Sequence, residues 1–306
     1  MPEFKEKFIQ TYEKLTDIED FKKYSLEKLT KSVRVNTLKI SVKELKERLE
    51  NQNFKLKQIP WCKQGFWVLD GPRTDLGNLK EHSLGYIYVQ EAASMIPPIV
   101  LNPDENDLVL DMAAAPGSKT TQMASLMNND GLIIANDYKY DRIKALGINL
   151  QRCGVLNTMI TLMEGKRFSN AMIKFDKILL DAPCSGTGAI RKSLKTLKMW
   201  NPNMFKKLAG IQKQLITVAF ETLKENGILV YSTCSIAPEE NEAVIDFLLT
   251  RNKNARLESI NLDIKRSDSI TEYNKDIYSQ EIKKCLRIWP QDNNTEGFFI
   301  AKIKKV

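Results

Sequence analysis

The chain has 306 residues, enough for one large domain or for a domain of about 200 residues with a smaller companion. Hydrophobic residues make up 42% and charged residues 27%, which excludes a disordered or collagen-like chain. The net charge of +8 favours a polyanionic partner only where the excess is concentrated. The sequence has no apolar run of about 18 residues and no apolar signal core near its start, so we expect no membrane span and a cytoplasmic protein.

Cysteine and histidine usage limits the chemistry that the chain can perform. A zinc site needs about four clustered Cys or His ligands, and the widely spaced cysteines with a single histidine, His82, predict no metal site. The odd cysteine count indicates a reducing compartment. A Ser-His or Cys-His catalytic pair would have to use His82, which precedes every motif described below. The cysteines are Cys62, Cys153, Cys184, Cys234 and Cys285.

Residues 1–80 are predicted to form a small α+β domain. Apolar residues at helical spacing predict a helix over residues 4–15, and residues 34–40 alternate like a strand. Ser41 begins a Ser-x-x-Glu capping box followed by an amphipathic helix. A second strand is predicted over residues 66–69.

Residues 81–306 are predicted to form an α/β domain. From about residue 105, short apolar runs alternate with amphipathic helical stretches, a pattern typical of a mostly parallel sheet covered on both faces. Residues 256–285 are polar and weakly periodic, and they predict no element. The predicted strands cover residues 108–110, 132–135, 158–162, 178–180, 228–231 and 298–300.

Polar residues follow several of these strands directly. In open parallel sheets ligands bind at the carboxyl ends of the strands, so these side chains are expected to share one edge. A single strand-terminal Asp is as often a turn or cap residue, but four polar residues together favour a site. They are Asp111, Asp137, Asp181 and Cys234.

The segment 111–120 lies between a predicted strand and a predicted helix. Its small residues allow a ligand to approach the backbone, but it lacks the glycine spacing of a P-loop or a dinucleotide-binding loop. Asp137, after the next strand, is placed to bind ribose hydroxyls. A nucleoside cofactor without a pyrophosphate, such as S-adenosylmethionine (SAM), fits this combination.

Several motifs in this order resemble the Nol/Nop/Sun (Fmu) family of RNA 5-methylcytosine methyltransferases, in its archaeal tRNA-methylating form. The resemblance extends over residues 88–301 and implies a Rossmann-like SAM-dependent methyltransferase domain, with a smaller RRM-like α+β domain before it. The matching segments are residues 88–94, 111–120, 181–188, 232–242 and 297–301.

The resemblance implies a catalytic role for two cysteines. Carbon 5 of cytosine is a poor nucleophile, and a thiolate added at carbon 6 makes it reactive toward the methyl group of SAM. By resemblance Cys234 is the attacking residue, Cys184 assists product release, and Asp181 contacts the base near ring nitrogen 3.

The resemblance also implies a set of cofactor-binding residues. Glu164 stands where the family usually has Asp, and by resemblance it contacts the adenine side of the cofactor. The residues are Ala113, Ala114, Ala115, Pro116, Gly117, Ser118, Lys119, Asp137, Arg142, Glu164 and Asp181.

The basic excess is concentrated in residues 182–220, which hold seven Lys or Arg and no Asp or Glu. We expect this segment to bind RNA phosphates and to offer one tryptophan for base stacking, although a basic solvated helix face is the alternative. The predicted RNA-binding residues are Arg191, Lys192, Lys195, Lys198 and Trp200.

The preferred interpretation is a monomeric, SAM-dependent RNA cytosine-5 methyltransferase acting on tRNA, with an unpaired or flipped cytosine as the target. Ribosomal RNA is the alternative substrate, and a non-catalytic RNA-binding protein of the same fold is the alternative class. A DNA cytosine-5 methyltransferase is disfavoured, because Glu240-Asn241 is followed by Glu242 and belongs to the Cys234 motif.

Overall fold

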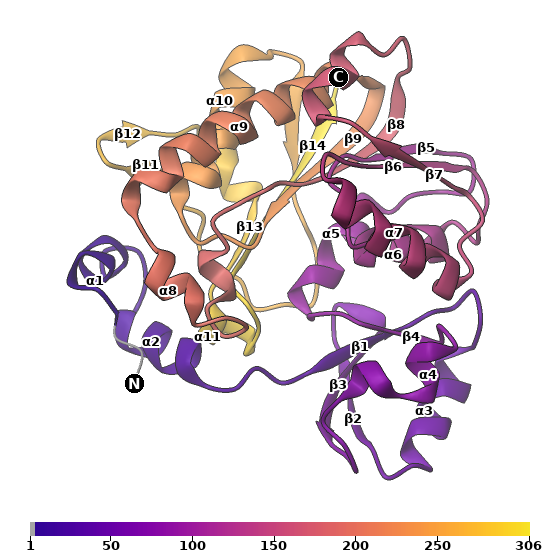
Figure 1. Ribbon diagram of the computed structural model, residues 1–306. Helices are drawn as coiled ribbons and strands as arrows, with labels where there is room; N and C mark the ends of the chain where they lie inside the picture. The colour runs from indigo at the N-terminus through magenta and orange to yellow at the C-terminus, as the bar shows by residue number, and fades with distance from the viewer. Residues whose placement is uncertain (1–3) are drawn as a thin grey trace.

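The computed structural model describes residues 4–306, in which a small and a large β-sheet stand side by side (Figure 1). The chain starts with two helices, α1 (Glu6–Tyr12) and α2 (Ile18–Leu26). Asp17 caps α2 by accepting hydrogen bonds from two backbone amides of its first turn. The helix predicted over residues 4–15 is therefore confirmed, in a shorter form.

The two N-terminal helices pack on the large domain rather than on the small one. Phe8 and Phe21 lie in one aromatic cluster with Trp200 and Phe205, next to α8 (Lys195–Met199). Figure 1 shows α1 and α2 beside α8 and α11 (Pro290–Asn293). The first 26 residues thus contribute to the core of the large domain.

The small sheet has the strand order β2-β3-β1-β4, with every neighbouring pair antiparallel. A β-α-β-β-α-β chain in this order is the RRM-type arrangement, which confirms the predicted fold. Ser41 and Glu44 form the predicted capping box. The elements are β1 (Ser32–Val35), α3 (Val42–Glu50), β2 (Lys55–Ile59), β3 (Cys62–Asp70), α4 (Lys80–Ser83) and β4 (Ile87–Val89).

Two boundaries differ from the prediction. β1 ends at Val35, and the strand predicted to reach residue 40 turns away there. The amide of Asn36 donates to the carbonyls of Gly85 and Cys153, and these two bonds hold the turn. β4 lies beyond residue 80, so the small sheet continues past the predicted domain boundary.

The large sheet has the order β10-β14-β9-β8-β5-β6-β7, with β13 paired to β14. Its central strands are parallel, and β14 runs antiparallel to β9. The chain reverses its direction of travel across the sheet between β5 and β8, which makes this the topological switch point. The strands are β5 (Leu108–Asp111), β6 (Leu132–Asp137), β7 (Thr158–Leu162), β8 (Phe175–Asp181), β9 (Leu223–Thr233), β10 (Ala255–Glu258), β13 (Leu286–Ile288) and β14 (Phe298–Lys305).

Helices cover both faces of this sheet, as the sequence predicted. Ile178 and Leu180 belong to a core with α9 and α10, whereas Leu179 between them belongs to a core with α5 and α6. The segment predicted to have no element contains β10 and the hairpin of β11 (Glu272–Tyr273) and β12 (Asp276–Ile277). The covering helices are α5 (Ile96–Leu101), α6 (Ser118–Leu126), α7 (Tyr140–Cys153), α9 (Pro202–Glu221) and α10 (Glu242–Arg251).

Within residues 4–306 no helix has both the length and the apolar character needed to cross a membrane.

Candidate active site

The polar residues predicted to share one sheet edge do lie together. Asp111, Asp137 and Asp181 are the last residues of β5, β6 and β8, and Cys234 follows β9 directly. In the parallel register Asp111 stands beside Ala135, one strand away from Asp181. The edge therefore includes the switch point between β5 and β8.

Two cysteines meet at this edge. The sulfur atoms of Cys184 and Cys234 are 3.3 Å apart. The loops that present them are linked through backbone hydrogen bonds, from Ala182 N to Ser232 O at 2.9 Å and from Gly188 N to Cys234 O at 2.9 Å. A side chain at Gly188 would collide with the carbonyl of Gly297, so only glycine permits this close approach.

The surroundings of Cys184 favour its protonated form. The hydrogen bond to Cys234 raises the pKa of the Cys184 thiol well above its ordinary value, with burial as the second cause. Negative charge on Cys234, Glu240 and Asp181 raises this pKa further. The Cys184 thiol is thus held in its protonated form.

Asp181 is joined to its surroundings through both carboxylate oxygens. Lys119 Nζ lies 2.7 Å from Oδ2, and Ser232 Oγ donates to Oδ1 at 2.8 Å. Burial alone would lower the pKa of the Lys119 ammonium, but the charge of Asp181 and their hydrogen bond raise it above its ordinary value. A fixed cation and a fixed carboxylate therefore flank the cysteine pair.

Asp111 is fully buried below this edge. Burial raises the pKa of its carboxyl to about 7, although the hydrogen bond from Thr120 Oγ1, at 2.7 Å, opposes the shift. A proton on this group therefore titrates close to neutral pH.

The loop 113–119 folds tightly before α6. Gly117 has φ +103°, and a Cβ there would lie 2.9 Å from the side chain of Leu146. Arg142, from α7, donates to the carbonyl of Ala115. The absence of side chains beyond Cβ at residues 113–115 leaves the backbone open to a ligand.

The loop and the neighbouring acids fit a nucleoside cofactor. Asp137 Oδ2 is buried and accepts no hydrogen bond from any described residue, although Arg142 Nη1 lies 3.3 Å away. A buried acceptor at the end of β6 that receives no hydrogen bond suits a ribose hydroxyl donor. Glu164, beyond the end of β7, is exposed and pairs with Lys166 at 2.7 Å.

Among residues 4–306, no three His, Cys, Asp or Glu side chains are grouped closely enough to hold a metal ion.

Two family models together match most of the chain. One, described as 16S rRNA methyltransferase RsmB/F, matches residues 98–304. The other, described as the N-terminal domain of 16S rRNA methyltransferase RsmF, matches residues 2–92. The chain belongs to the RsmB/F methyltransferase family. The predicted resemblance is thereby confirmed, and the DNA-methylating class is not the family that matches.

Two curated relatives illustrate the range of the family. The chain is 48% identical to the tRNA (cytosine(49)-C(5))-methyltransferase of Pyrococcus abyssi, over 98% of this chain and 96% of the relative. It is 44% identical to the ribosomal RNA small subunit methyltransferase F of Shewanella piezotolerans, over 94% of this chain and 60% of the relative. The chain thus spans less than two thirds of the second relative's length.

Two solved structures share the fold over nearly the whole chain. A methyltransferase homolog from Pyrococcus horikoshii has a TM-score of 0.90 at 38% identity, with coverage of 100% of this chain and 96% of that one. A structure of NSun6 from Pyrococcus horikoshii with SFG has a TM-score of 0.85 at 27% identity, with coverage of 99% and 98%.

The predicted RNA-binding residues of this RsmB/F methyltransferase divide into two groups. Lys192, Lys195 and Lys198 are exposed, in and before α8. Trp200 is only 3% exposed, because its ring packs against Phe8 in the aromatic cluster, so its predicted availability for stacking is wrong.

Arg191 also differs from the prediction, because its guanidinium is buried and already occupied. It donates to the carbonyls of Glu27, Lys28 and Thr295 at 3.2–3.3 Å. Arg191 therefore joins the linker before β1 to the catalytic domain, and a role in binding RNA phosphates is not open to it in this structure.

Sequence reasoning missed the polar network around the cysteines. The carboxylate of Glu240, on the 3-10 helix Pro238–Glu240, accepts hydrogen bonds from Ser185, Gln212 and Ser235. Asn241 accepts from Thr233 and donates to the carbonyl of Ser235. The only signal was the polar run 238–242 after Cys234, which gave no hint of its partners.

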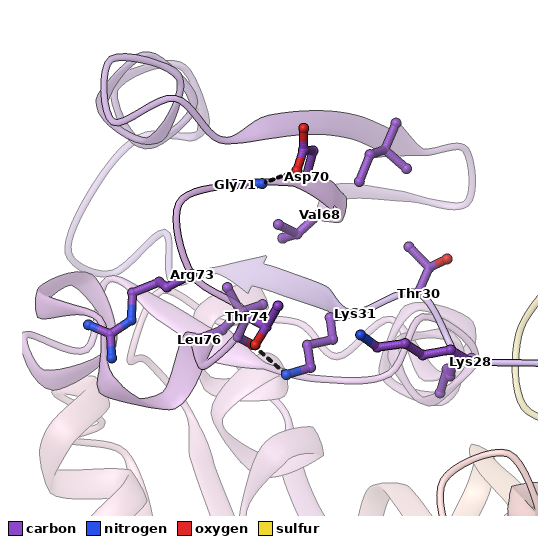
Figure 2. Close-up of a pocket in the computed structure, with 11 residues that line it drawn as sticks. Lys28, Thr30, Lys31, Val68, Asp70, Gly71, Arg73, Thr74 and Leu76 are labelled. Atoms are coloured by element: carbon purple, nitrogen blue, oxygen red, sulfur yellow. Dashed lines mark hydrogen bonds between the residues drawn. The ribbon is translucent and has the colours of Figure 1, made fainter.

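A cationic pocket of about 230 Å³ lies where the linker meets the small sheet (Figure 2). Lys28 and Lys31 approach it from the linker, and Arg73 comes from the loop after β3. Lys31 donates to the carbonyl of Thr74, and Asp70 is the only acid among the lining residues.

Proposed function

We propose that this RsmB/F methyltransferase transfers a methyl group from SAM to carbon 5 of a cytosine in RNA, with tRNA as its substrate. The observation that supports it most strongly is the 3.3 Å contact between the sulfurs of Cys184 and Cys234 at the switch-point edge. Two thiols in contact, beside a loop suited to a nucleoside, match a reaction that both forms and breaks a thioether.

The proposed cofactor site combines the loop 113–119 with the acids at the strand ends. SAM supplies an electrophilic methyl group when it is bound there. Asp137 Oδ2 would accept a ribose hydroxyl, and Arg142 would keep the loop in place through the carbonyl of Ala115. Asp181 would place negative charge near the sulfonium. Glu164 is proposed to contact the adenine side, with its ion pair to Lys166 as a competitor.

The proposed chemistry assigns one task to each residue at the edge. The Cys234 thiolate adds to carbon 6 of cytosine, and the electron pair of the C5–C6 double bond becomes available at carbon 5. Ring nitrogen 3 takes up a proton from solvent as Cys234 attacks and returns it when Cys234 leaves. Asp181 accepts a hydrogen bond from this protonated nitrogen, and Lys119 keeps the carboxylate in position. After methyl transfer, loss of the carbon 5 proton restores the double bond and expels the Cys234 thiolate. Cys184 assists this release.

The RNA is proposed to extend from the cysteines toward the small domain. Lys192, Lys195 and Lys198 are exposed in the segment that follows the Cys184 loop, and they would contact phosphates. Arg191 connects this segment to the linker at Lys28, whose side chain lines the cationic pocket (Figure 2). An RNA strand with its cytosine at Cys234 would therefore meet the exposed lysines at one end of this path and the cationic pocket at the other.

The choice of tRNA rests on sequence identity. The chain is 48% identical to the tRNA-methylating relative from Pyrococcus abyssi and 44% identical to the rRNA-methylating one from Shewanella piezotolerans. Ribosomal RNA is the second candidate, because the family models are described by that substrate.

The test is to incubate the enzyme and SAM with unmodified tRNA or with 16S rRNA, each in a separate reaction, and to map 5-methylcytosine by bisulfite sequencing. We expect a methylated cytosine in tRNA and none when Cys234 is replaced by Ser. Methylation confined to 16S rRNA would overturn the choice of substrate. Methylation of neither RNA would overturn the function.

A further inference from the structure

Glu240 links the two cysteine loops, although it touches neither sulfur. Its Oε1 accepts from the backbone N–H of Ser185 at 2.9 Å and from Gln212 Nε2 at 3.0 Å. Its Oε2 accepts from the hydroxyls of Ser185 and Ser235. Ser185 follows Cys184 and Ser235 follows Cys234, so one carboxylate is bonded to the residue after each cysteine.

This network is buried and nearly complete. Glu240 is 0% exposed, and Ser235 and Thr187 are 1% exposed. Thr187 Oγ1 lies 3.1 Å from both serine hydroxyls and also accepts from the backbone of Ile236. Four donors point at one carboxyl group, and each of its two oxygens accepts two hydrogen bonds.

Charge is distributed unequally around the two sulfurs. The negative charge of Glu240 acts on Cys184 and opposes loss of its proton, together with the charge of Asp181. On the other side, Lys119 interacts electrostatically with Cys234 and is bonded to Asp181. Tyr231, whose hydroxyl donates to the carbonyl of Glu240, also interacts with Cys184. The charged and titratable groups around the pair are therefore Glu240, Asp181, Lys119 and Tyr231.

We propose that Glu240 is a positioning residue that holds Cys184 and Cys234 in contact and keeps their shared proton on Cys184, so that Cys234 is the thiolate. The inference rests on the proposed function, because the position of the proton matters only if one sulfur attacks and the other assists release. The structure thereby explains why the second cysteine does not compete for carbon 6.

In this proposal both cysteines return to their starting protonation states after one turnover. Cys234 attacks as a thiolate while Cys184 carries the proton. Once Cys234 has become a thioether, its negative charge and its hydrogen bond to Cys184 are lost, and Cys184 can release its proton to solvent. The Cys184 thiolate then takes the proton from carbon 5, and the Cys234 thiolate leaves. One proton is released to solvent for each methyl group transferred.

The test measures alkylation of each cysteine by iodoacetamide as a function of pH, by mass spectrometry, without RNA or cofactor. At pH 7.5 we expect Cys234 to react roughly tenfold faster than Cys184 in the unaltered protein, because the thiolate is the reactive form. In Glu240→Gln the ratio should fall toward one, and the pH profile of Cys184 should move to lower pH. Glu240→Asp, which keeps the charge, should recover much of the ratio.

A matched control uses Glu239, a carboxylate in the same turn that is not bonded to either serine. Glu239→Gln should leave the ratio unchanged. An unchanged ratio in Glu240→Gln, or an equal loss in both variants, would overturn the inference. Because the labelling needs no substrate, it succeeds or fails independently of the methylation assay that tests the proposed function.

A second measurement tests the positioning role of Glu240 even if Glu240→Gln does not fold. Ser185→Ala and Ser235→Ala each remove one hydroxyl donor and leave the carboxylate in place. We expect disulfide formation between Cys184 and Cys234, induced by diamide, to slow by roughly threefold or more, since the exchange needs aligned sulfurs. An unchanged rate in both variants would overturn the positioning role.

Discussion

Cys184 Sγ and Cys234 Sγ are 3.3 Å apart, although 50 residues separate them in the chain. The contact exists because β8 and β9 are parallel neighbours, so the loops after both strands emerge at the same edge. Backbone bonds such as Gly188 N to Cys234 O keep the loops in register. Displacement of either loop would therefore separate the thiols.

Replacing Cys234 by Ala should abolish methyl transfer and leave SAM affinity nearly unchanged, because the proposed cofactor loop lies on β5 and α6. Radiolabel transfer to RNA and calorimetric titration with SAM measure the two properties. Cys62→Ala is a matched control, since that cysteine is buried in the small domain. Full activity in Cys234→Ala would contradict the assignment of the nucleophile.

Replacing Cys184 by Ala should allow attack but impair release, so a covalent protein–RNA adduct should accumulate. The adduct appears as a slowly migrating band on a denaturing gel after incubation with RNA and SAM. The double variant Cys184→Ala/Cys234→Ala should form none. Normal turnover without an adduct in the single variant would show that Cys184 has no part in release.

Asp111 should make the protein less stable as the pH rises toward neutral. Its folded pKa of about 7 lies above the ordinary carboxyl value, so the folded state keeps a proton that the unfolded state loses. The stabilisation is complete below about pH 4 and is lost as the pH rises through 7, at roughly 1 kcal/mol for each pH unit. Melting temperatures between pH 4.5 and 8 should therefore fall more steeply than in Asp111→Asn. If melting temperature varied with pH in the same way in both proteins, the raised pKa of Asp111 would be refuted.

Arg191→Ala should lower the melting temperature, because it leaves three backbone carbonyls of the linker and of residue 295 without their donor. A loss of about 2 kcal/mol in the free energy of unfolding is expected. The double variant Lys192→Ala/Lys195→Ala should keep its melting temperature but bind RNA with a shallower dependence on salt. If Arg191→Ala kept its melting temperature and instead bound RNA with a shallower salt dependence, Arg191 would be an RNA-binding residue.

The cationic pocket of Figure 2 gives a separate prediction for RNA affinity. Lys28→Ala/Arg73→Ala should reduce the slope of log K against log salt by roughly 2, because each removed cation leaves one phosphate with its counterion. Lys253→Ala, at an exposed position just after α10 in the large domain, should leave the slope unchanged. An unaltered slope in the double variant would place the RNA elsewhere.

Features that depend on near neighbours in the chain were predicted from the sequence. The capping box of Ser41 and Glu44 is one example, and the strands ending at Asp111, Asp137 and Asp181 are others. Periodicity and capping report the local backbone and the face that a segment buries. Both cysteine motifs could be recognised because their members are adjacent in sequence.

Tertiary structure alone decided which surface each segment would meet. The burial of Trp200 and Arg191 depends on helices and a linker more than 160 residues earlier in the chain. The hydrogen bonds that Glu240 accepts from Ser185 and Gln212 depend on strand order and on the placement of α9. An amphipathic pattern shows that a face is buried but does not specify its partner, because contacts between distant segments arise only when the sheet assembles.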